Sequence, residues 1–358
     1  MTKLKSLLKA GFKMKTEIFE ITDPVKDLPA ILYAADVIKN GGLVAFPTET
    51  VYGLGGNALD ENAAKKIYSA KGRPSDNPLI VHISDPDQAS LYTYIEDPSA
   101  KLYMDHFWPG PLTLVMNKKP VIPDQVTAGL QTVGLRCPSH QVARTLIREA
   151  GVPIAAPSAN LSGRPSTTEA SHVIDDLNGR VDVILCQGSS VYGLESTVLD
   201  ITVKPAVILR PGFITWEDLS CISRDVLQSS DSSVKDDIPK APGMKYRHYA
   251  PKAKIILVRG DTDKASEYIR RMVKSNTDEK ACVLTVNECA HEFEGLCTFD
   301  LGCLSNPPQI AANLFSVLRE IDKTDTDVIY SMYLSGKGLF ISIMNRLKKA
   351  AGDYIVDV

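Results

Sequence analysis

The chain has 358 residues, more than the roughly 250–300 at which a single hydrophobic core stops growing, so we expect two domains. Its composition, 44% hydrophobic and 23% charged residues, is that of a folded globular protein and excludes a disordered chain. A formal net charge of −3 argues against a protein whose main role is to bind nucleic-acid phosphates, because such domains are usually strongly basic.

Targeting segments and cysteine motifs are not recognisable in the sequence. No apolar run approaches the roughly 20 residues that span a bilayer, and no signal peptide is apparent, so we expect a cytoplasmic protein. The seven cysteines never form a C-x-x-C pair, which argues against a zinc or dithiol site. The lysine-rich residues 1–24 are expected to form an extension before the fold.

The first part of the chain alternates apolar strands with amphipathic helices. Apolar periodicity predicts helices over residues 29–39 and 61–70. Strand-like runs recur over residues 43–47, 79–83, 111–116, 133–138, 152–157, 181–185, 196–201 and 206–212. This pattern predicts one α/β domain with a mixed, twisted sheet over residues 25–217.

A polar, charged stretch separates this domain from a second pattern of strands and helices. Residues 218–253 are expected to be a linker, and Thr215 with Asp218 has the spacing of a capping box. Beyond it, strands are predicted over 254–260, 280–286, 297–302 and 327–334, and helices near 263–274, 307–322 and 338–350. This alternation predicts a smaller Rossmann-like parallel α/β domain over residues 254–358, without a G-x-G-x-x-G dinucleotide motif.

Common motifs for nucleotide binding and hydrolysis are absent, so any nucleotide site is of an unusual kind. The sequence has no G-x-x-x-x-G-K-[ST] loop, no G-x-S-x-G elbow and no H-E-x-x-H helix. The first candidate for ligand binding is the predicted loop FPTETVYGLGGNA, because ligands usually bind at the carboxyl ends of strands in α/β domains. An ordinary glycine-rich turn would explain the same residues.

The segment KGRPSDNP, residues 71–78, places Lys71 and Arg73 two positions apart at a predicted helix end. A solvated helix end with Gly72 as the C-cap explains the positive charges. It does not explain the two prolines and the Asp-Asn pair, which stiffen the loop and hold both cations in a fixed arrangement. Such an arrangement suits a triphosphate or a carboxylate.

Polar side chains near the ends of other strands are further candidates. His82 lies in an apolar strand on the face opposite to its neighbours, where a hydrogen-bonded core histidine is the alternative. Arg136 and Arg210 each end an apolar strand, which predicts a positive cleft. In the loop APSANLSGRPSTTEA, Ser166 and Glu169 have capping-box spacing, and a hydroxyl-rich helix N-terminus also suits an anion.

Seven stretches occur in one characteristic order: PTETVYGLG, KGRPSDNPLIVHI, FWPGPLTLV, TVGLRCPSH, APSANLSGRPS, LESTVLDI and ILRPG. In this order they resemble the YrdC-like domain of threonylcarbamoyl-AMP synthases over approximately residues 25–215. The stretch APGMKYRHYAPKA, residues 241–253, resembles the linker of the two-domain members, whose C-terminal domain is Rossmann-like. The resemblance covers almost the whole chain, although the C-terminal part matches in architecture more than in motifs.

The resemblance implies a reaction in which L-threonine, bicarbonate and ATP give threonylcarbamoyl-AMP and pyrophosphate, usually with Mg²⁺. Partner proteins would then use the product to modify the adenosine beside the anticodon of certain tRNAs. Every reacting species is or becomes anionic, so fixed cations and oriented donors would supply the stabilisation. We expect no strong direct binding of tRNA and no membrane partner.

The family's functional positions can be carried over to residues of this chain. Those around threonine match Thr50, His82, Arg136, Ala156 and Ser196. Those around ATP match Arg73, Asn77, Thr132, Ser158, Asn160, Ser166 and Arg210. Lys71 and Arg73 are expected to act in catalysis through their charge, and a lid over the cavity is expected from Tyr246, Arg247, His248 and Tyr249. No residue is assigned to Mg²⁺, which would arrive with the ATP phosphates, and no general base is obvious.

Two other functions remain open at this stage. A carbamoyltransferase that forms a carbamoyl-adenylate would use a similar domain, but such proteins carry zinc-finger modules and this chain has no paired C-x-x-C. A double-stranded RNA-binding module would use the basic cleft, but the acidic net charge disfavours it.

Overall fold

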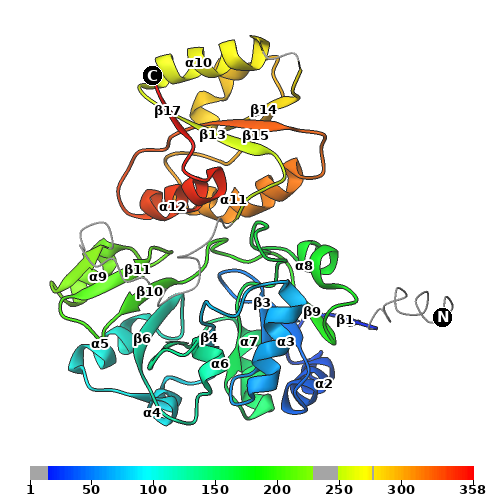
Figure 1. Ribbon diagram of the computed structural model, residues 1–358, viewed down its shortest axis with the longest axis vertical. Coiled ribbons are helices and arrows are strands. Elements are labelled where there is room, and N and C mark those ends of the chain that lie inside the picture. Colours follow the sequence, from blue (N-terminus) through cyan, green and yellow to red (C-terminus); the bar gives the residue numbers. More distant parts are fainter. Residues whose placement is uncertain (1–14, 229–248, 276–277) are drawn as a thin grey trace, which may run out of the picture.

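The computed structural model describes residues 15–228, 249–275 and 278–358, and it shows two α/β domains stacked on each other (Figure 1). Within the described residues, the first domain contains a mixed sheet of twelve strands and the second a parallel sheet of five. The expected fold class, a mixed α/β domain followed by a smaller Rossmann-like one, is confirmed. In the part of the chain that the structure describes, no helix has the length and apolar character needed to cross a bilayer.

The first domain carries its strands and helices in alternation. Its strands are β1 (Glu17–Glu20), β2 (Val44–Phe46), β3 (Gly53–Asn57), β4 (Ile80–His82), β5 (Thr93–Tyr94), β6 (Leu112–Lys118), β7 (Thr132–Arg136), β8 (Ile154–Ala155), β9 (Val183–Cys186), β10 (Thr197–Asp200), β11 (Ala206–Arg210) and β12 (Val226–Gln228). Its helices are α2 (Leu28–Lys39), α3 (Glu61–Lys71), the 3₁₀ helix η1 (Pro86–Gln88), α4 (Ala89–Tyr92), α5 (Pro98–Phe107), α6 (Asp124–Thr127), α7 (Gln141–Ala150), α8 (Ala170–Leu177) and α9 (Trp216–Ile222).

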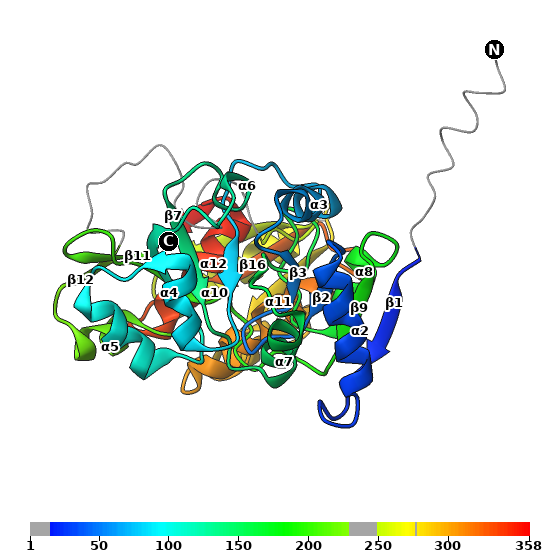
Figure 2. The same ribbon diagram turned by 90° about the horizontal axis from the view of Figure 1, so that it is seen from below.

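The strand order in the first sheet is β1-β9-β2-β3-β8-β4-β7-β6-β10-β11-β12, and β5 pairs with β6. Figure 2 shows β1 and β12 at opposite ends of this sheet. Strand β12 and all but the first two residues of helix α9 lie in the segment that was expected to be a linker, and β12 pairs in parallel with β11. The predicted capping box is confirmed at the start of α9, where Thr215 and Asp218 bond reciprocally.

Helices α2 and α7 cover one face of this sheet. The buried residues of α2 follow helical spacing, with Ile31, Ala34, Ala35 and Ile38 on one side. They pack with Val44 and Phe46 of β2, whereas the intervening Ala45 belongs to the core cluster of the other face. The alternation along β2 therefore joins two separate cores across one sheet.

Strand β3 corrects the expectation of a loop over FPTETVYGLGGNA. Residues Gly53–Asn57 pair antiparallel with β2 on one side and with β8 on the other. A Cβ atom at Gly55 would lie 2.6 Å from Ile154 Cγ2 and 2.7 Å from Phe46 Cε1. The expectation failed because Gly55 allows side chains to pack closely over a strand, a role that the sequence does not distinguish from that of a turn glycine.

The second domain is an open parallel sheet with helices on both faces. Its strands are β13 (Lys254–Arg259), β14 (Ala281–Thr285), β15 (Thr298–Asp300), β16 (Val328–Met332) and β17 (Ile355–Asp357), in the order β15-β14-β16-β13-β17. Its helices are α10 (Thr262–Ser275), the 3₁₀ helix η2 (Asn287–Phe293), α11 (Pro307–Ile321) and α12 (Leu339–Ala351). Figure 1 shows α11 and α12 between this sheet and the first domain, with α10 on the opposite face.

The two domains meet in a close, partly apolar interface. Val51 and Leu194 of the first domain are buried in the hydrophobic cluster of the second. Gly193 has a φ of +67°, and a Cβ atom there would lie only 2.4 Å from the Cα atom of Ala312 in α11. Glycine therefore sets the approach of the two backbones at this point.

Gly193→Ala should lower the free energy of unfolding by at least about 1 kcal/mol more than Gly188→Ala, because an extra methyl group in a packed site is destabilising. Both glycines have positive φ, +67° and +50°, but a Cβ atom at Gly188 would meet nothing within 4 Å. The control therefore isolates the clash from the backbone strain. Urea denaturation of both variants measures the difference, and equal losses would contradict the expected clash with α11.

Candidate active site

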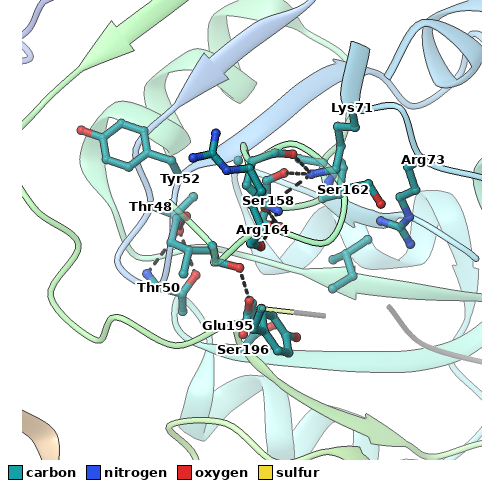
Figure 3. A pocket seen from close by; sticks show the side chains of 18 of the residues that line it. Thr48, Thr50, Tyr52, Lys71, Arg73, Ser158, Ser162, Arg164, Glu195 and Ser196 are labelled. Carbon is teal, nitrogen blue, oxygen red and sulfur yellow. Dashed lines mark hydrogen bonds between the residues drawn. The ribbon is translucent and has the colours of Figure 1, made fainter. Parts of the chain in front are cut away.

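A polar pocket lies in the first domain where several strand ends and loops converge (Figure 3). It is lined by Thr48, Thr50, Val51, Tyr52, Gly53, Lys71, Arg73, Ile80, His82, Arg136, Ala156, Pro157, Ser158, Asn160, Ser162, Gly163, Arg164, Ser166, Glu195, Ser196, Arg210 and Tyr249. Among these described residues, five are cationic and Glu195 is the single carboxylate. The pocket is therefore strongly positive within a chain whose formal net charge is −3.

Lys71 is the last residue of α3, and Gly72 ends the helix in the left-handed conformation with a φ of 60°. This confirms the predicted C-cap, but the interpretation of Lys71 as a solvated helix end is wrong, because its side chain is buried. Its Nζ atom donates to the carbonyl oxygen of Ser158 and, at 2.5 Å, to that of Asn160. Burial lowers the pKa of Lys71 well below its usual value. The lysine thus ties the end of α3 to the loop that contains Ser158 and Asn160 (Figure 3).

Arg73 is fixed by the loop that follows α3. Its Nη2 atom donates to the carbonyl oxygen of Asn77 at 3.2 Å, and the hydroxyl of Tyr68 donates to the same oxygen at 2.9 Å. The guanidinium carbon lies 5.9 Å from the centroid of the Tyr68 ring. Desolvation lowers the pKa of Arg73, whose half-buried side chain is held at the pocket wall.

Arg136 stands at the end of β7 and is held by three acceptors. Its Nη2 atom donates to Glu49 Oε1 at 2.6 Å, Nη1 to Thr50 Oγ1 at 2.9 Å, and Nε to the carbonyl oxygen of Gly110 at 3.2 Å. Burial alone would raise the pKa of Glu49, but the charge of Arg136 and its hydrogen bond hold it below the usual value. This buried ion pair fixes the plane of the guanidinium.

His82 ends β4 beside Arg136, with which it pairs in register. Its Nδ1 atom lies 3.2 Å from the carbonyl oxygen of Ile80, and its ring stands edge-on to Phe46 with centroids 6.4 Å apart. Burial, together with the charge of Arg136, lowers the pKa of His82 to about 3. The imidazole is therefore neutral at physiological pH.

Ser166 and Arg210 are held by Glu195 and Ser196, two neighbouring residues of the motif LEST that leads into β10. The Ser166 hydroxyl donates to Glu195 Oε1 at 2.5 Å, so the predicted capping box of Ser166 with Glu169 is wrong. Helix α8 begins only at Ala170, with Glu169 in the N-cap position and no side-chain cap, so Ser166 lies too early in the chain to cap it. Arg210 donates through Nη2 to the carbonyl oxygen of Ser196 at 2.9 Å, and burial lowers its pKa to about 10.

Known protein families and curated relatives match almost the whole chain. Residues 36–212 match the family described as Telomere recombination, and residues 214–352 match the one described as Threonylcarbamoyl-AMP synthase, C-terminal domain. The threonylcarbamoyl-AMP synthases of Pyrococcus abyssi and Bacillus subtilis are 45% and 42% identical to this chain. The matches cover 92% and 96% of this chain and 96% and 99% of those relatives. The chain belongs to the threonylcarbamoyl-AMP synthase family.

As a member of the threonylcarbamoyl-AMP synthase family, the chain is an enzyme. The crystal structure of P. abyssi Sua5 complexed with L-threonine has the same two-domain fold, with a TM-score of 0.89 and 43% sequence identity. That match covers 96% of this chain and 100% of the relative. The recognised resemblance and the expected architecture are both confirmed.

Most of the residues that the threonylcarbamoyl-AMP synthase resemblance singled out meet in the pocket. They are Thr50, Lys71, Arg73, His82, Arg136, Ala156, Ser158, Asn160, Ser166, Ser196, Arg210 and Tyr249. Asn77 and Thr132 are not among the described lining residues: Asn77 anchors Arg73 through its backbone, and Thr132 lies at the opposite end of β7 from Arg136. Of the expected lid, Tyr246, Arg247 and His248 lie outside the described residues.

The sequence did not predict several contacts that support the pocket. Glu49 and Glu195 stand inside the family motifs PTET and LEST, which was the available signal, but no role had been assigned to them. Tyr249 was expected in the lid, but its contact with the second domain was not: it has a φ of 67° and stacks on Phe315 of α11 with ring centroids 5.2 Å apart. Arg346 of α12 contacts Glu195, and nothing in its helical pattern marks it. The C-terminal domain therefore contributes to the surroundings of the pocket.

The wild-type protein should lose stability as the pH falls below about 6.5, partly because unfolded His82 takes up a proton that the folded form, with a pKa of about 3, does not. His82→Asn should reduce this slope between pH 6.5 and 5 by up to about 1.4 kcal/mol per pH unit. Urea denaturation at several pH values measures the slope. An imidazole NMR signal of His82 that titrates between pH 8 and 5 in the folded protein would contradict the neutral assignment.

Proposed function

We propose that this protein makes threonylcarbamoyl-AMP and pyrophosphate from L-threonine, bicarbonate and ATP. The observation that carries the proposal is the charge of one largely buried pocket, whose described lining residues include five cations and one carboxylate. The cations are Lys71, Arg73, Arg136, Arg164 and Arg210. A triphosphate and a carboxylate substrate would each find fixed cations there, and a largely buried site strengthens such interactions.

The threonine site is proposed around the end of β7. Arg136 has five N–H groups, and among the described residues three of them donate to Thr50, Glu49 and Gly110. The others would be donors for the threonine carboxylate. Neutral His82 and the Ser196 hydroxyl line the same pocket and would contact the amine and hydroxyl of the substrate. Ala156 would contact its methyl group.

The ATP site is proposed around the loop that Lys71 holds. Ser158, Asn160, Ser166 and Arg210 line the pocket. The Ser158 and Ser166 hydroxyls donate to Asn160 and Glu195, and the Asn160 amide donates to two loop carbonyls, so these three residues would have to exchange those bonds for phosphate oxygens. Arg210 would contribute its charge. Asn77 would act through its hold on Arg73, and Thr132 remains a proposal from the family resemblance. Among the described residues no group of three or more His, Cys, Asp or Glu side chains is arranged to hold a metal. Mg²⁺ is therefore proposed to come with the ATP phosphates, and no residue is assigned to it.

In the proposed reaction the threonine amine attacks the carbon of bicarbonate, a C–N bond forms and water leaves. The carbamate oxygen then attacks the α-phosphorus of ATP, a new P–O bond forms and the bond to pyrophosphate breaks. The residues of this pocket would orient the reactants and stabilise the charge of the leaving group, through Lys71, Arg73 and Arg210. The product would pass to partner proteins for tRNA modification, and Tyr249 with the preceding residues would exclude water from the mixed anhydride.

Purified protein should release pyrophosphate only when ATP, Mg²⁺, bicarbonate and L-threonine are all present. The requirement follows because the carbamate nucleophile forms only from threonine and bicarbonate. A coupled pyrophosphate assay with each component omitted in turn measures it. Release at the full rate without threonine would refute the assignment.

Arg73→Ala should lower kcat/KM by about 100-fold, the typical effect of removing one preorganised charge-stabilising group. The melting temperature should change little, because the Arg73 side chain is only half-buried and its hydrogen bond to the carbonyl oxygen of Asn77 lies within one loop. Arg148→Ala provides the control, since that side chain is exposed and pairs with Glu149 at the surface. Unchanged turnover in Arg73→Ala would assign Arg73 to the helix end alone.

A further inference from the structure

The one carboxylate among the described lining residues, Glu195, is bound by both domains. Its side chain is buried, and its Oε1 atom accepts the hydrogen bond from Ser166 Oγ at 2.5 Å. Its Oε2 atom accepts a hydrogen bond from Arg346 Nε at 2.8 Å. Arg346 belongs to α12, so a residue of the C-terminal domain reaches a wall of the pocket through one carboxylate.

Arg346 is fully buried and is oriented by several groups. Its Nη1 atom donates to the carbonyl oxygen of Pro211 at 2.8 Å and to Asn345 Oδ1 at 3.0 Å. Its guanidinium carbon lies 5.6 Å from the centroid of the Tyr249 ring, which also lines the pocket. The arginine is therefore fixed against the first domain.

Glu195 carries a negative charge inside a positive pocket. Burial alone would raise its pKa, but the charges of Arg346 and Arg210, with hydrogen bonds from Ser166 and Arg346, hold it below the usual value. Glu195 is thus ionised in a pocket where the other charged residues of the described lining are cations. A buried carboxylate that loses its partner becomes an uncompensated charge, which would repel an incoming anion.

We propose that Arg346 of the C-terminal domain is a positioning residue of the active site, which neutralises and orients Glu195 so that the cationic wall of the pocket can receive an anionic nucleotide. The inference rests on the proposed function, since it takes ATP as the ligand. In this arrangement the C-terminal domain supplies the counter-ion of Glu195. Arg346 itself touches no substrate in this arrangement.

The test is a double-mutant cycle of Arg346→Met and Glu195→Gln, with ATP affinity as the readout. Arg346→Met should raise the KM for ATP by at least about 10-fold, which corresponds to roughly 1.4 kcal/mol. The double variant should return this KM to within about 3-fold of the wild-type value, because the unpaired carboxylate is gone. An Arg346→Met variant with wild-type KM, or a folded double variant as impaired as the single one, would overturn the proposal.

Ser342→Ala is the matched control for a purely structural effect. Ser342 lies on the same helix, is buried, and donates to the carbonyl oxygen of Gly212 across the same interface at 2.7 Å. Its loss should lower the melting temperature without the rise in KM for ATP. If Arg346→Met fails to fold, Arg346→Lys tests the proposal in its place. Because lysine keeps the positive charge, the KM for ATP should stay within about 3-fold of the wild-type value. A rise of about 10-fold in this KM would overturn the proposal.

Equilibrium binding separates this inference from the proposed function. Calorimetry with ATP alone should show the weakened affinity of Arg346→Met and its recovery in the double variant, whether or not the protein turns over. If the wild-type protein binds ATP but never releases pyrophosphate, the proposed function is refuted, whereas the double-mutant cycle still measures the effect of Arg346 on ATP affinity. Wild-type turnover with equal ATP affinity in all variants would refute only the role of Arg346.

Discussion

The hydrogen-bonded ion pair between Glu195 and Arg346 is the interaction on which the pocket and the interface both depend. Replacing one partner of a buried pair leaves a buried charge without compensation, which costs more than the pair itself contributes. The Glu195 carboxylate is shared by a serine of the pocket and an arginine of the second domain. This one contact therefore contributes both to the packing of the two domains and to the charge balance of the pocket.

The rest of the pocket follows the same physical rule, that a buried charge must have partners. Arg136 is bound to Glu49, and Lys71 to the carbonyl oxygens of Ser158 and Asn160. These contacts hold two cations in place before any ligand arrives, so a polyanion meets charges that need little rearrangement. Preorganisation of this kind is what phosphoryl and acyl-phosphate chemistry requires from a protein.

Much of this arrangement was predictable from the sequence, because apolar periodicity and ordered motifs are local signals. The strands around His82 and Arg136 and the helix that ends at Lys71 were expected, and they form β4, β7 and α3. The partner of Ser166 was not predictable, since Glu169 offered equally good local spacing and the actual partner is 29 positions away. Arg346 was missed for a similar reason: its partner is 151 positions away and in the other domain.

The burial of Glu195 and Arg346 also decides how this protein responds to salt. Ions screen exposed pairs strongly, so the contact of Arg259 with Asp357, whose side chains are 51% and 66% exposed, weakens as ionic strength rises. The side chains of Arg346 and Glu195 are 0% and 8% exposed, and mobile ions cannot reach between them. A salt-rich environment would therefore slow the encounter with charged substrates while the electrostatic balance inside the pocket stays nearly constant.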